Sequence, residues 1–254
     1  MVSFVCFLWN DGFRNYKAEQ INMLARAVAR FYQYPHRFIC VTDVTRGFSP
    51  EVEVLPIPKA AQSVASLEAP QGKNFPSSYR RLWCFSQEAV TLGERIMLLD
   101  VDCMVVGDLA PLFEIDADFV GWRPITIWGR EDRIGGGTWL LKTGKLPWLW
   151  ENFKKGPTKM IQETKAAGWN GSDQAILSRF LHAKYPTWPQ MCGIYGSQDG
   201  VFQWEMPPAG ARIIHFNGDG KPWGQDKLWI RAYCNYFGGA HAAEKRKIQE
   251  SNQC

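Results

Sequence analysis

Two aspartates separated by a single residue, Asp100 and Asp102, are the first residues with the chemistry of a binding site. They follow Arg95–Leu99, a short apolar run that predicts a buried strand. Ligands of open α/β sheets bind beyond the carboxyl ends of strands, and residues i and i+2 of an extended chain share a face. Both carboxylates can therefore bind one divalent cation, which would neutralise charge on a diphosphate. On its own this D-x-D pattern is common, and a turn before the next strand is the simpler explanation.

A second group of candidates lies in the segment HFNGDGKPW at 215–223. His215 ends an apolar run, and a neutral imidazole is a good ligand for Mn²⁺ beside carboxylates. Gly218 and Gly220 let the backbone approach a ligand closely, and Lys221 supplies a compact positive charge for a phosphate oxygen. Each feature alone is usually structural. Together with the acidic pair they predict a clamp for a metal and a diphosphate.

The sequence GSDQ at 171–174 opens a predicted helix over 172–183. Ser172 is a typical N-cap residue, so a purely structural role explains it well. Asp173 or Gln174 can instead face a transferred sugar, and the sequence leaves the choice between these roles open.

The elements that must position these residues alternate as in α/β proteins. Apolar runs and periodicity predict strands at 2–9, 37–42, 52–57, 95–99, 118–121, 138–142 and 212–216. Helices are expected at 21–31, 77–92, 145–154, 172–183 and 223–236, with a loop over 61–76. The helix over 77–92 carries Arg80 and Arg81, which either reach the D-x-D carboxylates or a phosphate, or lie on a solvated face. This order favours a Rossmann-like, mostly parallel sheet with helices on both faces.

We expect one domain over residues 1–240, followed by a polar tail at 241–254. The domain would have a nucleotide-sugar lobe at about 1–125 and an acceptor lobe at about 126–240. The net charge of +4 suits an anionic ligand such as a nucleotide, but it is too small for a dedicated nucleic-acid binder.

Seven scattered cysteines without a C-x-x-C pair argue against a disulfide framework or a zinc knuckle, and are typical of reduced thiols. No apolar run reaches the ~18 residues that span a bilayer, and the N-terminus lacks the basic start of a signal peptide. A soluble, cytoplasmic protein is the resulting expectation.

The run RLWCFSQEAVTLGERIMLLDVDCMVVGDLAPLFE at 81–114 resembles the family 8 glycosyltransferases, the group of glycogenin and the bacterial lipopolysaccharide galactosyltransferases. That family has a helix with a basic residue, an apolar strand, D-x-D, a short strand and a small helix, in this order. In this chain DL at 108–109 and LF at 112–113 match the motif of the small helix. Its closing motif H-F-x-G-x-x-K-P-W matches every fixed position of 215–223, and DQ at 173–174 matches its D-Q pair. The resemblance extends over roughly residues 1–235 and implies a GT-A fold in a single domain.

The resemblance also implies the role of each residue. The ligands of Mn²⁺, or of Mg²⁺, would be Asp100, Asp102 and His215. The donor, a UDP-sugar, would be bound by Leu8, Asn10, Asp11, Arg81 (less expectedly Arg80), Asp100, Val101, Gly218 and Lys221. The residues near the anomeric carbon would be Asp173 and Gln174, and Lys221 would take part in catalysis.

The implied activity is transfer of a hexose from a nucleotide diphosphate sugar, with retention of anomeric configuration. The family's Asn-x-Gly segment is replaced by GGGT at 135–138, so the sugar-binding Asn is missing and the transferred sugar is left open. The acceptor is also open among a glycan, a protein, a lipid-linked sugar and nucleic acid, including a modified DNA base.

Two other functions compete with sugar transfer. Nucleotidyl transfer onto a sugar phosphate also uses D-x-D and a basic loop, although NDG at 10–12 is poor in glycine for a phosphate loop. A binding module that has lost turnover is the third alternative, and the intact Asp100, Asp102, His215 and Lys221 count against it.

Overall fold

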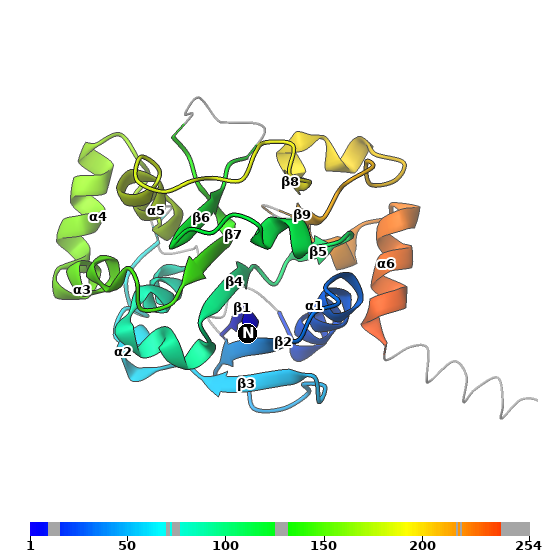
Figure 1. Ribbon diagram of the computed structural model, residues 1–254, viewed down its shortest axis with the longest axis horizontal. Coiled ribbons are helices and arrows are strands. Elements are labelled where there is room, and N and C mark those ends of the chain that lie inside the picture. Colours follow the sequence, from blue (N-terminus) through cyan, green and yellow to red (C-terminus); the bar gives the residue numbers. More distant parts are fainter. Residues whose placement is uncertain are drawn as a thin grey trace, which may run out of the picture.

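A six-stranded sheet forms the centre of the molecule, in the order β3-β2-β1-β4-β7-β6 (Figure 1). The computed structural model describes residues 1–9, 16–69, 72, 77–124, 132–216, 218 and 220–239. The strands of this sheet are β1 (Val2–Leu8), β2 (His36–Thr42), β3 (Val52–Pro56), β4 (Arg95–Leu99), β6 (Phe119–Trp122) and β7 (Gly135–Lys142). The first four in the spatial order are parallel, β7 is antiparallel to β4, and β6 is antiparallel to β7. Five of the six strands therefore point the same way, which confirms the mostly parallel sheet.

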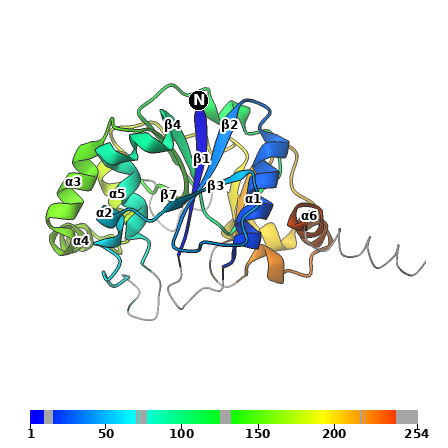
Figure 2. The same ribbon diagram turned by 90° about the horizontal axis from the view of Figure 1, so that it is seen from below.

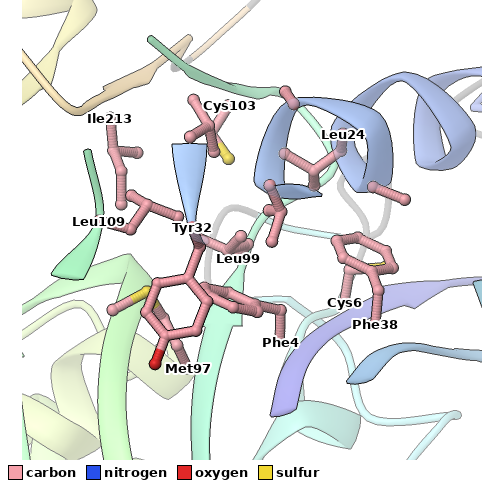
Figure 3. Close-up of a cluster of buried hydrophobic side chains, with 14 of the residues drawn as sticks. Phe4, Cys6, Leu24, Tyr32, Phe38, Met97, Leu99, Cys103, Leu109 and Ile213 are labelled. Atoms are coloured by element: carbon pink, nitrogen blue, oxygen red, sulfur yellow. The ribbon is translucent and has the colours of Figure 1, made fainter. Parts of the chain in front are cut away.

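Both faces of this sheet are buried, because successive residues of each strand join two different cores. In β1, Phe4, Cys6 and Leu8 belong to one cluster of buried side chains, whereas Val5 and Phe7 belong to another. Figure 3 shows the centre of the first cluster, where side chains from β1, β2, β4 and the first helix meet. Parallel strands covered on both faces are almost continuously apolar, which is why these runs are recognisable in the sequence.

Helices cover the two faces (Figures 1 and 2). On the first face lie α1 (Ala18–Phe31) and α6 (Leu228–Gly238). On the second lie α2 (Lys59–Gln62), α3 (Pro147–Lys155), α4 (Pro157–Ala166) and α5 (Asp173–Leu181). Among the described residues, no helix combines the length and apolarity needed to cross a membrane.

A second, three-stranded sheet joins distant parts of the sequence. It consists of β5 (Cys103–Val105), β9 (Ile213–His215) and β8 (Ile194–Gly196), in that order. In the antiparallel pair of β5 and β9, Cys103 lies opposite His215. This pairing brings the residues just after β4 next to the start of the HFNGDGKPW segment.

The predicted helix over 77–92 is instead two 3₁₀ segments, Tyr79–Phe85 and Gln87–Leu92. Ser86 separates them, because its backbone is extended and its side chain accepts a hydrogen bond from the Ala89 N–H, which starts the second segment. The second segment ends at Gly93, which has φ of 121°.

Other boundaries also differ from the sequence prediction. Pro222–Gly224 forms a separate 3₁₀ turn, so α6 begins at Leu228 rather than near 223. β7 begins at Gly135, three residues before the expected start, and α2 extends into the loop expected over 61–76. The sequence also did not predict α4 or β8. The tail at 241–254 lies outside the described residues.

The buried cysteines give a prediction about thiol reactivity. All six described cysteines are free, and the side chains of Cys6, Cys40, Cys84 and Cys103 are buried. Burial raises the pKa of the Cys6, Cys84 and Cys103 thiols, so at pH 8 the reactive thiolate is scarce as well as inaccessible. We expect iodoacetamide to modify these three positions only on unfolding, whereas all seven cysteines react in denaturant. Peptide mapping by mass spectrometry measures this, and rapid native labelling of Cys84 would contradict it.

Candidate active site

The D-x-D pair lies in the turn between β4 and β5, at the carboxyl end of the parallel strands. The Asp100 N–H donates to the Gly137 carbonyl at 2.9 Å, which ties the turn to β7. The Phe216 N–H donates to the Asp102 carbonyl at 3.2 Å, which ties it to the segment after β9. The backbone thus fixes both aspartates between the two sheets.

Arg81 connects Asp100 to Asp173. Its Nε and Nη2 donate to Asp173 Oδ2 at 3.0 and 2.5 Å, and its Nη1 donates to Asp100 Oδ1. Arg81 and Asp173 are only 8% and 6% exposed. Burial by itself lowers the pKa of Arg81, but the two carboxylates outweigh it, so the pKa is raised and the guanidinium stays charged.

Asp173 is placed by the start of α5. Ser172 caps this helix, since its Oγ accepts a hydrogen bond from the Ala175 N–H at 3.2 Å, so its structural interpretation is confirmed. The buried Tyr79 hydroxyl donates to the Gly171 carbonyl at 2.8 Å and anchors the chain just before the cap. Gln174 Oε1 accepts from the Gly136 N–H at 3.1 Å and lies beside β7.

Asp102 is paired with Lys221. Lys221 Nζ lies 2.5 Å from Asp102 Oδ2 and donates to the Phe216 carbonyl at 2.9 Å. The Tyr16 hydroxyl donates to the same Asp102 Oδ2 at 2.9 Å, and the Tyr16 ring meets Trp223 edge-on with centroids 5.5 Å apart. The sequence prediction did not include Tyr16, which has no motif or periodicity to mark it.

His215 is buried and its ring contacts two side chains. It is 1% exposed, and its ring is stacked on Trp122 with centroids 4.6 Å apart and 22° between the planes. Its Nε2 lies 2.8 Å from Thr138 Oγ1. Burial, reinforced by Arg81 and opposed by Asp102, lowers the pKa of His215 to about 4. The imidazole is therefore neutral at pH 7, the form that binds metals.

Three successive glycines of β7 make room for these side chains. A Cβ at Gly135 would overlap the Trp122 ring, and one at Gly136 would lie 3.0 Å from the Gln174 Cβ. A Cβ at Gly137 would lie 2.7 Å from His215 Nδ1 and 3.1 Å from Asp100 Oδ2. The run GGG at 135–137 therefore lies directly against the candidate site. Two predicted metal ligands, Asp100 and His215, border the same space beside Gly137.

The donor set suits a divalent cation. Carboxylates and a neutral imidazole are ligands of divalent cations, and the Asp100, Asp102 and His215 side chains supply both kinds. In the part of the chain that the structure describes, no three acidic, cysteine or histidine side chains are gathered as a ready-made metal centre. Asp100 and Asp102 instead each contact a basic side chain, so a cation at Asp102 Oδ2 would compete with Lys221.

The other predicted donor-binding residues differ in their burial and in their contacts. The Leu8 and Val101 side chains are buried in the first core, so only their backbone is available to a ligand. Gly218 has φ of 74° and open space around it. Arg80 Cζ lies 4.8 Å from the centroid of the Trp9 ring, whereas Arg81 contacts both Asp100 and Asp173, which favours Arg81 for the site. Asn10 and Asp11 lie outside the described residues.

Comparisons with known proteins find similarity in structure but not in sequence. No protein-family model and no curated protein matches the chain. Its structure is similar to that of the galactosyltransferase LgtC in complex with donor and acceptor sugar analogues, with a TM-score of 0.63 and 14% identity over 94% of this chain and 95% of that one.

Two larger proteins are also similar. The glycosyltransferase GlyE from Streptococcus pneumoniae TIGR4 has a TM-score of 0.60 and 17% identity over 92% of this chain, and the bifunctional WbbM has 0.62 and 13% over 94%. The chain covers only 59% and 50% of these two proteins. Such identities show the fold, so the α/β GT-A fold implied by the resemblance to family 8 is confirmed.

Proposed function

We propose that this chain is a metal-dependent glycosyltransferase that moves a hexose from a UDP-sugar to an acceptor. One observation carries the proposal: residues predicted from four distant segments meet at the carboxyl end of β4. Arg81 joins Asp100 to Asp173, and Lys221 contacts Asp102. In a fold shared with glycosyltransferases, this edge of the sheet is where ligands of open α/β sheets bind.

Asp100, Asp102 and His215 would hold the cation, Mn²⁺ or Mg²⁺. When bound there, the cation supplies positive charge for the diphosphate leaving group. The neutral His215 and the two aspartate side chains that follow β4 support this assignment. Lys221 and the backbone at Gly218 hold the diphosphate. As the bond between the anomeric carbon and the phosphate oxygen breaks, its electron pair passes to the diphosphate, beside the Lys221 ammonium.

Asp173 and Gln174 lie at the start of α5, one bound to Arg81 and the other to Gly136. We assign them to the transferred hexose, where a carboxylate and an amide oxygen stabilise an oxocarbenium-like centre. The acceptor oxygen then bonds to the anomeric carbon on the face that the diphosphate leaves, and its proton passes to the departing phosphate oxygen. The product retains the anomeric configuration, which ¹H NMR of the anomeric proton tests.

We also propose that the protein works in the cytoplasm. The six cysteines that the structure describes are free, and free thiols suit a reducing compartment. The acceptor is a glycan, a protein, a lipid-linked sugar or nucleic acid, and no described residue selects among these classes.

UDP should stabilise the protein only when a divalent cation is present. A ligand that binds the folded state adds RT ln(1 + [L]/Kd), about 2.7 kcal/mol at 100 times Kd. For a chain of this size that corresponds to a rise in Tm of roughly 5 to 10 °C. We expect this rise with UDP and Mn²⁺ together, and little with UDP in EDTA, in a thermal-shift assay. Equal rises in Tm with UDP in Mn²⁺ and in EDTA would show that UDP binding needs no metal. No rise in either condition would contradict UDP binding itself.

A further inference from the structure

We propose that Trp122 and Thr138 are positioning residues that set the orientation of the His215 ring, with Nδ1 turned to the space that Asp100 also borders. This inference rests on the proposed function, because it gives His215 a role as a metal ligand. Neither residue is among the predicted metal ligands or donor-binding residues. Their role follows from two contacts with the imidazole and from one contact that fixes Trp122.

The first contact is the stacking of Trp122 on His215. Trp122 is the last residue of β6 and is 3% exposed. Its ring is nearly parallel to the imidazole, at 22° and 4.6 Å between centroids. A ring packed face to face prevents the imidazole from tilting out of its plane.

The second contact fixes Trp122 itself. Gly135 lies opposite Trp122 in the pairing of β6 and β7, and the indole lies over the Gly135 Cα, where any side chain would overlap it. The missing side chain at Gly135 therefore leaves room for the Trp122 ring beside His215.

The third contact sets which ring nitrogen carries the proton. The Thr138 hydroxyl donates its single hydrogen to the Gly137 carbonyl at 2.9 Å. Its oxygen then accepts from His215 Nε2–H at 2.8 Å. We therefore assign the proton to Nε2, which leaves the lone pair on Nδ1, the nitrogen beside Gly137 and Asp100. Partners of this kind orient the imidazole of metal-binding histidines and set its tautomer.

The indole N–H of Trp122 adds no hydrogen bond that would hold the ring. Within the described part of the chain this buried Nε1 has no hydrogen-bond partner. The packing of the indole between Gly135 and His215 is therefore what places the ring.

The experiment is a titration of the full chain with MnCl₂ alone, in which electron paramagnetic resonance measures the free cation. We expect Trp122→Leu and Thr138→Val to weaken Mn²⁺ binding by about 10- to 100-fold, the usual effect of losing such a partner. Trp122→Phe keeps an aromatic face, and Thr138→Ser keeps the hydroxyl, so both should retain most of the affinity. ¹⁵N NMR of labelled histidine should show the His215 proton on Nε2 in the wild type and a changed distribution in Thr138→Val.

Trp150→Leu is the matched control, because Trp150 is also buried but lies in α3 within the second core. It should lower Tm without changing Mn²⁺ affinity. Wild-type affinity in both Trp122→Leu and Thr138→Val would overturn the positioning role while leaving the metal site intact. A wild type that binds no Mn²⁺, with or without UDP, would instead overturn the proposed function and this inference with it. If Trp122→Leu does not fold, the comparison of Thr138→Val with Thr138→Ser decides.

Discussion

Asp102→Asn should abolish Mn²⁺-dependent binding of the UDP donor while preserving the shape of the side chain. Of the two aspartates in the D-x-D pair, Asp102 is the one whose carboxylate contacts Lys221 and Tyr16. Its side chain is only 12% exposed. An amide carries no charge and is a weak ligand for a hard cation. The substitution also leaves the Lys221 ammonium beside an uncharged group, so some loss of stability accompanies it. We therefore measure Mn²⁺ binding by isothermal titration well below the Tm of the variant.

The matched control for this substitution is Asp116→Asn. Asp116 is also paired with a lysine, Lys142, at 2.7 Å, but it is exposed and distant in the fold from the D-x-D turn. The control should bind Mn²⁺ and donor like the wild type. Turnover of donor at the wild-type rate by Asp102→Asn in Mn²⁺ would show that the site assignment is wrong.

The sequence predicts the central sheet well because its strands are buried on both faces. Runs such as VSFVCFL and RIMLL are apolar throughout, so their strands are visible without any alignment. Elements with less burial are missed. β8 has three residues, and α4 is largely polar and follows α3 after the single residue Gly156, a pattern that also fits a turn.

The candidate site is predictable where charged residues stand out against apolar strands. Asp100, Asp102, His215 and Lys221 are such residues, and the structure brings them to one edge of the sheet. The residues that hold them are not predictable in this way. Trp122 and Thr138 are ordinary strand residues by composition, and their contacts with His215 depend on the pairing of β7 with β6 and on the approach of a different sheet.

Tyr16 and the Arg81 network show the same limit at long range. Tyr16 lies 86 residues from its partner Asp102, and Arg81 lies 92 residues from Asp173. The local sequence around either residue contains no sign of the partner. The order of strands in the sheet places β1, β4 and β7 side by side, and local sequence patterns do not reveal that order.

Lys221→Ala should separate catalysis from metal binding, because Lys221 and a metal use the same oxygen of Asp102. Lys221 Nζ contacts Asp102 Oδ2 in this structure, so a cation bound to that oxygen would take the place of the ammonium. Removing the ammonium should therefore leave Mn²⁺ affinity unchanged or make it tighter. The same change removes the charge that we propose acts on the departing diphosphate. Interactions that strengthen in the transition state raise kcat rather than only lower KM, so kcat should fall more than donor affinity.

We expect a loss in kcat of about 10²- to 10³-fold, the usual effect of removing one preorganised electrostatic group. Lys221→Arg should restore only part of the rate, because a planar guanidinium does not replace a point charge beside Asp102 and the Phe216 carbonyl. Lys142→Ala, which removes a lysine paired with the exposed Asp116, should leave kcat unchanged. Steady-state donor hydrolysis and Mn²⁺ titration of the three variants measure both effects. If Lys221 serves only to hold its loop, Lys221→Ala lowers Tm but keeps the wild-type kcat, and the segment HFNGDGKPW is then structural rather than catalytic.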